Sequence, residues 1–388
     1  MIGAGVFSAW GPAADAAAAG LLFGLVIAAV VAFCNATSSA QLAAVHPESG
    51  GTYVFARRQL SPSWGHLAGW SFIVGKTASC VALALTAGEY LWPDHARPVA
   101  IIAVALVAVV NIGGLSRTVA VTKCLLIVAI TALAAVIVAG WSASTTSLSR
   151  ITPIDTTVGG VLRSAGFLFF AFAGYARIAT LGEEVREPER VIPRAIVAAL
   201  AGAVVVYAVV GVAVLMALGP EALAASTQPL ADAVAAGPWS WAEPVVRVGA
   251  ALAAAGALLA LVAGLGRTSL AMAREGDLPR WLAAVHPRYQ VPHRAELTVA
   301  AVVVVLVLVA DLRGVIGFSS FGVLLYYFVA NAAARAQGPE QRRYPRWLQV
   351  LGCAGCLVLV ATLPWEAVVA GVLVFLVGIV VRVVRLRS

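Results

Sequence analysis

Long apolar stretches, separated by short polar segments, run along almost the whole chain. Eleven of them approach the length of about 20 residues that a helix needs to cross a bilayer, and a shorter apolar piece occupies 5–13. Because the stretches are apolar on all sides rather than alternating, they predict a bundle of membrane helices and not a β-barrel. They fall at about 20–44, 65–92, 97–113, 118–141, 158–183, 194–218, 240–270, 294–311, 312–335, 347–363 and 365–385.

Composition supports the same class of protein. Of the 388 residues, 61% are hydrophobic and only 11% are charged, whereas about a quarter of a soluble domain is charged. A soluble core could not bury this much apolar surface, so lipid must act as part of the solvent. We therefore expect an all-α integral membrane protein with the bilayer as its first partner.

The net charge of +8 is placed as a membrane topology requires. If the first segment ends outside, the loops on the inner side carry seventeen arginines, against five on or near the outer side. This positive-inside bias predicts a multi-pass protein of the cytoplasmic membrane with a cytoplasmic C-terminus, and it leaves no reason to expect a nucleic-acid partner. A signal peptide is excluded because the first basic residue is Arg57.

The remaining polar features are modest. Segments 46–58 and 274–296 are compact, polar and interrupted by prolines, and we expect short interfacial helices there. All five cysteines lie inside apolar stretches, and Cys353-x-x-Cys356 has no second pair or histidine nearby, so we interpret these cysteines as small apolar residues. The histidines show neither metal-ligand spacing nor a nucleophile arrangement. We expect no cofactor, no metal and no enzyme activity.

Two glycine-containing spots interrupt the apolar sequence at comparable places. One is Gly3-Ala4-Gly5 and the other is Gly174 in "FLFFAFAGYARIA", about 170 residues later. Five spans fill this interval, and an odd number of spans inverts the second half relative to the first. Interrupted hydrophobic segments at matching positions of two halves indicate a transporter binding site.

The chemistry of such an interruption suits a zwitterion. A broken helix exposes N–H groups at one half and C=O groups at the other. The N–H end favours a carboxylate, and the C=O end favours an ammonium group. Gly3 and Gly5 could equally be small residues that let two helices pack closely, and the pattern alone leaves both interpretations open. With no preceding strand and no following Lys-Ser/Thr, a nucleotide site is not indicated.

Three segments together resemble the amino acid–polyamine–organocation (APC) permeases. They are "MIGAGVF", "FLFFAFAGYA" followed by "GEEVREPERVIPRAI", and "AREGDLPRWLAAVHPRYQVPHRAE". The resemblance implies a LeuT-type fold with two inverted five-helix repeats and two further C-terminal helices. It places the first repeat at 1–141, with its first helix incomplete, the second repeat at 158–335, and the two further helices at 347–385.

The resemblance also implies a substrate site. The N–H groups of Ala4 and Gly5 would bind an α-carboxylate, and the carbonyls of Ile2, Phe170 and Ala173 would bind an α-amine. Phe170 would act as an aromatic gate, for which an ordinary packing role is the alternative. The candidate substrate-binding residues are therefore Ile2, Gly3, Ala4, Gly5, Phe170, Ala171, Ala173 and Gly174.

Two lysines lie within apolar stretches, where an ionisable residue suggests a function. Lys123 matches a lysine of similar proton-coupled permeases, so the resemblance implies a proton-coupling role; a lysine that snorkels to the interface is the alternative. Lys76 lies deeper in its stretch and has no such precedent. It is too far along one helix to reach Glu89, and we expect structural pairing or the lining of a polar cavity.

The residues after Gly174 bear on specificity. Several similar permeases of cationic substrates carry an acidic residue where this chain has Ala176, and Arg177 follows it. A basic substrate is therefore disfavoured and neutral or acidic amino acids gain, with a neutral one favoured overall, unless Arg177 faces away and pairs with a carboxylate elsewhere. Glu183 and Glu184 are candidate partners for nearby arginines, with solvated surface charge as the alternative.

The sequence thus predicts a secondary amino-acid transporter that works by alternating access and is coupled to protons. The alternatives are a non-transporting membrane sensor or subunit, and an exchanger without proton coupling. Met1 falls in the middle of the predicted first span, where a charged amine is costly. We therefore expect the native start to lie upstream, and a chain that begins at Met1 to lack the inner half of its first helix.

Overall fold

A computed structural model describes residues 3, 5–46, 50–142, 150, 152, 156–174 and 185–387. Within these ranges the regular structure is helical. The α-helices are α1 (Gly5–Ser8), α2 (Trp10–Ala17), α3 (Leu21–Val45), α4 (Thr52–Gln59), α5 (Pro62–Leu91), α6 (Ala96–Ile112), α7 (Leu115–Ser142), α8 (Val158–Phe172), α9 (Pro188–Ala225), α10 (Pro229–Ala235), α11 (Glu243–Arg274), α12 (His293–Val309), α13 (Leu312–Ala336), α14 (Arg346–Thr362) and α15 (Trp365–Arg387).

Helices occupy all eleven apolar stretches, although the described helix in stretch 158–183 ends at Phe172. The stretch at 365–385, for example, is α15, and the short piece at 5–13 contains α1 and the start of α2. The polar segments also contain short helices as expected, with α4 in the first and the 3₁₀ turn Arg280–Ala283 in the second. The predicted all-helical class is confirmed.

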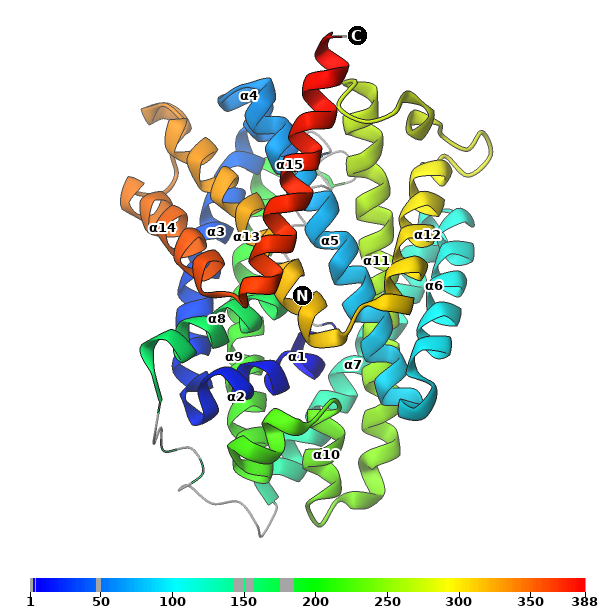
Figure 1. The fold of residues 1–388 in the computed structure, drawn as a ribbon, viewed down its shortest axis with the longest axis vertical. Coiled ribbons are helices and arrows are strands. Elements are labelled where there is room, and N and C mark those ends of the chain that lie inside the picture. Colours follow the sequence, from blue (N-terminus) through cyan, green and yellow to red (C-terminus); the bar gives the residue numbers. More distant parts are fainter. Residues whose placement is uncertain are drawn as a thin grey trace.

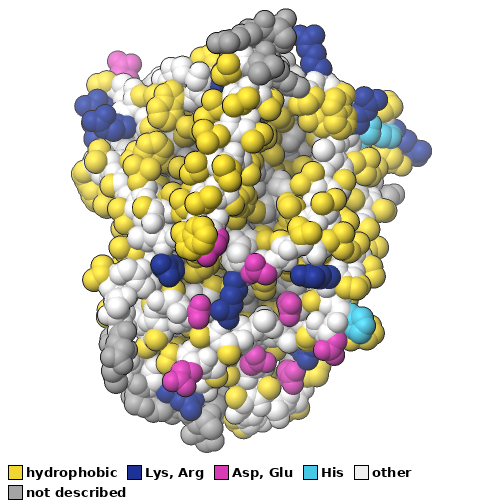
Figure 2. All heavy atoms as spheres, viewed as in Figure 1, with side chains coloured by type: hydrophobic (Ala, Val, Ile, Leu, Met, Phe, Trp, Pro, Cys, Tyr) yellow, Lys and Arg dark blue, Asp and Glu magenta, His cyan; other side chains and the backbone are white. Residues whose placement is uncertain are grey.

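The lengths and surface of the bundle fit a membrane. In the described part of the chain, seven helical segments are long and apolar enough to cross a bilayer, and three shorter helices are also apolar. Large apolar side chains such as Ile102, Leu106 and Leu376 are more than half exposed. Figure 2 shows a broad belt of such side chains on one face, with charged side chains gathered above and below it. Lipid is the solvent that this belt requires.

Helix α5 lies inside the bundle, between α13 and α11, with α6 and α4 also packed against it (Figure 1). Small residues permit the close approach. A Cβ atom on Gly75 would lie 2.9 Å from the backbone nitrogen of Val323 on α13, so only glycine fits between the two helices. Helix α3 packs similarly against α8 and α9. The short helices α1 and α2 therefore end up inside a frame of long helices.

The two ends of the molecule carry different structures (Figure 1). Helix α4 and the end of α15 lie at one end, which we call the α4 end. Helices α2 and α10 lie toward the opposite end, which we call the α10 end. Helices α1 and α8 lie between these ends, where a membrane would have its interior.

Candidate functional site

Helix α8 ends part-way through the molecule. The Thr157 side chain caps its start by accepting a hydrogen bond from the backbone N–H of Gly160. The helix has 15 residues, and its length of roughly 22 Å is shorter than the hydrocarbon core of a bilayer. Ala173 and Gly174 form one further turn. Carbonyl groups in the last turn of an α-helix generally lack intrahelical N–H donors and need other partners.

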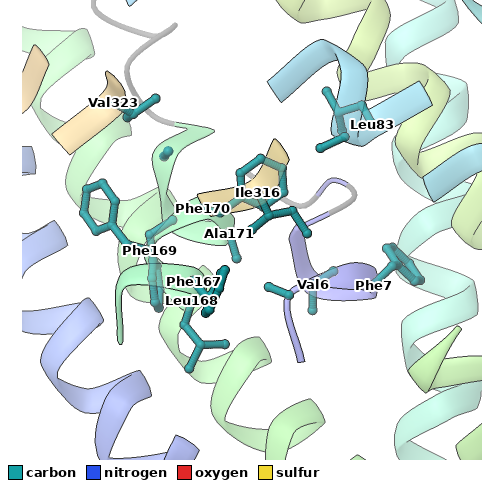
Figure 3. Packing of buried hydrophobic residues seen from close by; sticks show 14 of the residues in the cluster. Val6, Phe7, Leu83, Phe167, Leu168, Phe169, Phe170, Ala171, Ile316 and Val323 are labelled. Atoms are coloured by element: carbon teal, nitrogen blue, oxygen red, sulfur yellow. The ribbon is translucent and has the colours of Figure 1, made fainter. Parts of the chain in front are cut away.

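The start of α1 lies directly against this end of α8. A Cβ atom on Gly5 would overlap the backbone of Ala171, and a Cβ atom on Gly3 would lie 2.9 Å from the side chain of Ala257 on α11. Figure 3 shows Val6 of α1 beside Phe170 and Ala171 of α8. The two interrupted segments of the sequence are thus brought together, and glycine is required where their backbones touch.

Three carbonyl groups near the end of α8 have identified donors. The Ala171 carbonyl accepts a hydrogen bond from the Tyr207 hydroxyl at 2.9 Å. The Phe170 carbonyl accepts one from the backbone N–H of Ala173. The Ala173 carbonyl accepts one from the Lys76 ammonium group at 2.9 Å. Each carbonyl oxygen has two lone pairs, so the break presents a cluster of partly negative oxygens that can bind a cation.

On the side toward the α10 end, Tyr90 of α5 connects α1 to α10. Its hydroxyl donates to the Phe7 carbonyl at 2.8 Å and accepts from the backbone N–H of Leu230 at 3.3 Å. The Phe7 and Tyr90 rings also meet edge to face. The Arg247 guanidinium donates to the Tyr90 carbonyl at 2.9 Å and pairs with Glu243. Helix α10 therefore covers α1 from this side.

The predicted site residues fall into two groups. Gly3, Gly5, Phe170, Ala171 and Ala173 lie at the junction described above, where Phe170 is buried with 8% of its surface exposed. Gly174 follows them and is exposed. The other candidates lie outside the described residues, and they are Ile2, Ala4, Ala176, Arg177, Glu183 and Glu184.

With this geometry established, comparison with known proteins places the chain. The family model described as "Amino acid permease" matches residues 1–383. The chain belongs to the amino acid permease family. It is therefore a membrane transporter by family and not an enzyme, and the resemblance to the APC permeases is confirmed.

Individual members of the amino acid permease family match at different levels. An uncharacterized transporter of Mycobacterium tuberculosis is 54% identical over 99% of this chain and 88% of its own length. A branched-chain amino acid permease of Bacillus subtilis is 24% identical over 98% of this chain and 89% of its own length. A human protein, cationic amino acid transporter 4, is 28% identical over 86% of this chain and 56% of its own length.

Among the two lysines of this permease, the structure separates a buried one from an exposed one. Lys123 is exposed on α7. Lys76 has only 4% of its surface exposed and reaches the break in α8. The predicted role of Lys123 stays a prediction that rests on the family resemblance.

A buried carboxylate organises the α4 end of the permease. Asp277, just after α11, accepts hydrogen bonds from the Tyr53 hydroxyl at 2.8 Å and from Arg57 at 3.3 Å. His66 lies 3.4 Å and Arg382 lies 3.8 Å from its other oxygen. Burial alone would raise the pKa of Asp277, but the hydrogen bond from Tyr53 and the nearby His66 and Arg382 outweigh it and lower that pKa. Burial and the Asp277 carboxylate together raise the pKa of Tyr53.

Sequence reasoning assigned no functional role to Lys76, Tyr207, Tyr90 or Asp277. Only Lys76 carried a sequence signal, because it is a charged residue deep in an apolar stretch. Its observed partner is a backbone carbonyl. Tyr207 and Tyr90 are typical aromatic residues of membrane helices. Among the described residues, Cys34, Cys80, Cys353 and Cys356 are free.

Proposed function

We propose that this permease moves an amino acid across the cytoplasmic membrane by alternating access, as a secondary transporter. One observation carries the proposal: α8 stops inside the bundle and leaves the Ala173 carbonyl at a point where Gly5 of α1 touches α8. Backbone groups at a helix end in the middle of a membrane protein need partners, and such helix ends serve ligands or line cavities. Membership of the amino acid permease family supports a zwitterionic ligand.

The family also supports a LeuT-type architecture for the described helices. In this proposal 1–141 forms the first five-helix repeat, 158–335 forms the inverted second repeat, and 347–385 adds two helices. The interruption at Gly3–Gly5 and the one at Ala173–Gly174 then occupy equivalent positions. The C-terminus faces the cytoplasm, because the arginine-rich loops belong on that side.

For the substrate, the sequence favours a neutral amino acid and disfavours a basic one. The relatives bear names that refer to branched-chain and to cationic amino acids, so family membership alone does not decide which class of amino acid is transported. Purified protein in liposomes, offered a panel of labelled neutral, acidic and basic amino acids, tests the proposal. We expect saturable uptake of at least one of them. Binding without uptake would contradict transport and favour the alternative of a membrane sensor or subunit.

We further propose that uptake is proton-coupled and that Lys123 is the coupling residue. The prediction is that Lys123→Ala abolishes accumulation driven by a pH gradient and leaves exchange of substrate across the membrane intact. Accumulation and exchange are measured on the same liposomes with and without the gradient. Unchanged accumulation would remove Lys123 from the mechanism, and exchange without any gradient-driven accumulation in the unsubstituted protein would favour an uncoupled exchanger.

A further inference from the structure

Lys76 lies against the break in α8. It lies in the middle of α5, and its ammonium group donates to the carbonyl of Ala173, a residue 97 positions away in the sequence. Its surface is 4% exposed. Ala173 is the first residue after α8, so Lys76 contacts the end of the broken helix and not its side.

The contacts of Lys76 leave its positive charge uncompensated. An ammonium group has three donors, and the hydrogen bond to Ala173 uses one of them. Cys80 follows one helical turn along α5. Among the described residues, no carboxylate lies within 4 Å of its ammonium group. Buried charges in proteins are normally paired, and the described residues supply no such partner to Lys76.

Elsewhere the same chain does supply carboxylates to its cations. Arg57 pairs with Glu275 and Asp277, Arg247 pairs with Glu243, and Arg313 pairs with Asp15. All of these arginines are more exposed than Lys76. Lys76 is more buried than these arginines, yet the described residues supply it with no carboxylate. It also lies beside the proposed substrate site.

We propose that Lys76 is a specificity-determining residue that binds the side-chain carboxylate of an acidic amino acid. This inference rests on the proposed transport function. If the α-amine binds the carbonyls at the end of α8 as the family resemblance implies, it lies close to the Lys76 ammonium. A second carboxylate on the substrate offsets that repulsion, and a basic side chain adds to it. Where the sequence alone favoured a neutral substrate, Lys76 favours an acidic one.

Uptake by the full chain in liposomes at pH 7 tests the proposal, with glutamate, leucine and lysine as probes. We expect glutamate to be taken up at least tenfold faster than leucine, and lysine not to be taken up. In Lys76→Met, which keeps the length of the side chain without its charge, glutamate uptake falls at least tenfold and leucine uptake is retained or rises. Lys76→Arg keeps the charge and retains glutamate uptake in part.

The control is Thr86→Val on the same helix, because the Thr86 hydroxyl is buried and bonds only its own helix, at the Ala82 carbonyl. The preference of Thr86→Val for glutamate over leucine should equal that of the unsubstituted protein. Equal glutamate uptake by Lys76→Met, or equal loss of glutamate and leucine uptake in a folded Lys76→Met protein, would overturn the proposal. Faster uptake of leucine than of glutamate by the unsubstituted protein would also overturn the proposal, and this measurement does not depend on the folding of a variant. Absence of all three activities would instead contradict the transport function.

Discussion

Lys76 and Asp277 are both buried charged residues, but they differ in the partners that surround their charges. Asp277 at the α4 end has a hydroxyl, a histidine and two arginines around its carboxylate. Among the described residues, Lys76 in the middle of α5 has one backbone carbonyl as its hydrogen-bond partner. Removing one partner from a buried, compensated charge is strongly destabilising, whereas a charge that the described residues leave uncompensated is available to a ligand. The comparison predicts opposite results when each charge is removed.

The Asp277 network joins elements that are far apart in the sequence. Tyr53 and Arg57 come from α4, His66 comes from α5, and Arg382 comes from α15. The Trp70 indole adds a second link between α5 and α15, because it donates to the Val374 carbonyl at 3.1 Å. The carboxylate therefore holds three helices and the segment after α11 together at one end of the bundle.

The largest effect is expected for Asp277→Asn. Removing the charge leaves His66 and Arg382 without their shared partner, and breaking a buried ion pair costs roughly 3–5 kcal/mol. We expect a loss of about 3 kcal/mol of unfolding free energy, since Arg57 keeps its pair with Glu275. Thermal unfolding in detergent measures the change, and Asp94→Asn, at an exposed carboxylate, should change it by no more than about 0.5 kcal/mol.

The same residue predicts a dependence on pH. The pKa of Asp277 is lower in the folded protein than its ordinary value, so its ionised form stabilises the fold at pH above about 4. That contribution is lost as the pH falls from there through the lowered pKa. Acid titration of the unfolding temperature should therefore show a component below about pH 4 that is missing in Asp277→Asn. An identical acid profile for the two proteins would show that Asp277 does not stabilise the fold by its charge.

A smaller loss of stability and a complete loss of transport are expected for Gly5→Ala. The new methyl group would overlap the backbone of Ala171, and overpacking of this kind costs roughly 1–3 kcal/mol. Because it separates α1 from α8 at the proposed site, uptake should be lost even where the protein remains folded. Gly202→Ala on α9 is the matched control, since nothing lies within 4 Å of a Cβ atom there. Normal uptake by Gly5→Ala would place the substrate elsewhere.

The contrast between the two charges also shows what a sequence can and cannot predict. The apolar stretches predicted the helices because membrane-crossing length and hydrophobicity are local properties; α12, expected at 294–311, is observed at His293–Val309. The meeting of Gly5 with α8 could be expected from matching interruptions and from the family resemblance. The partners of Lys76 and Asp277 could not, because the Ala173 carbonyl and the Tyr53 hydroxyl lie 97 and 224 residues away. Only the packing of the helices decides which charge is compensated.

The smallest effect on stability is expected for Lys76→Met, and it is the sharpest test of the comparison. The substitution removes one hydrogen bond to Ala173, worth about 1 kcal/mol. It also removes an uncompensated buried charge and replaces it with an apolar side chain of similar length, which is neutral or stabilising for buried charges in other proteins. The unfolding free energy in detergent without substrate should therefore change by no more than about 1 kcal/mol, or should rise. A loss of 2 kcal/mol or more would mean that Lys76 holds α5 to the end of α8 as a structural residue, and the distinction between it and Asp277 would fail.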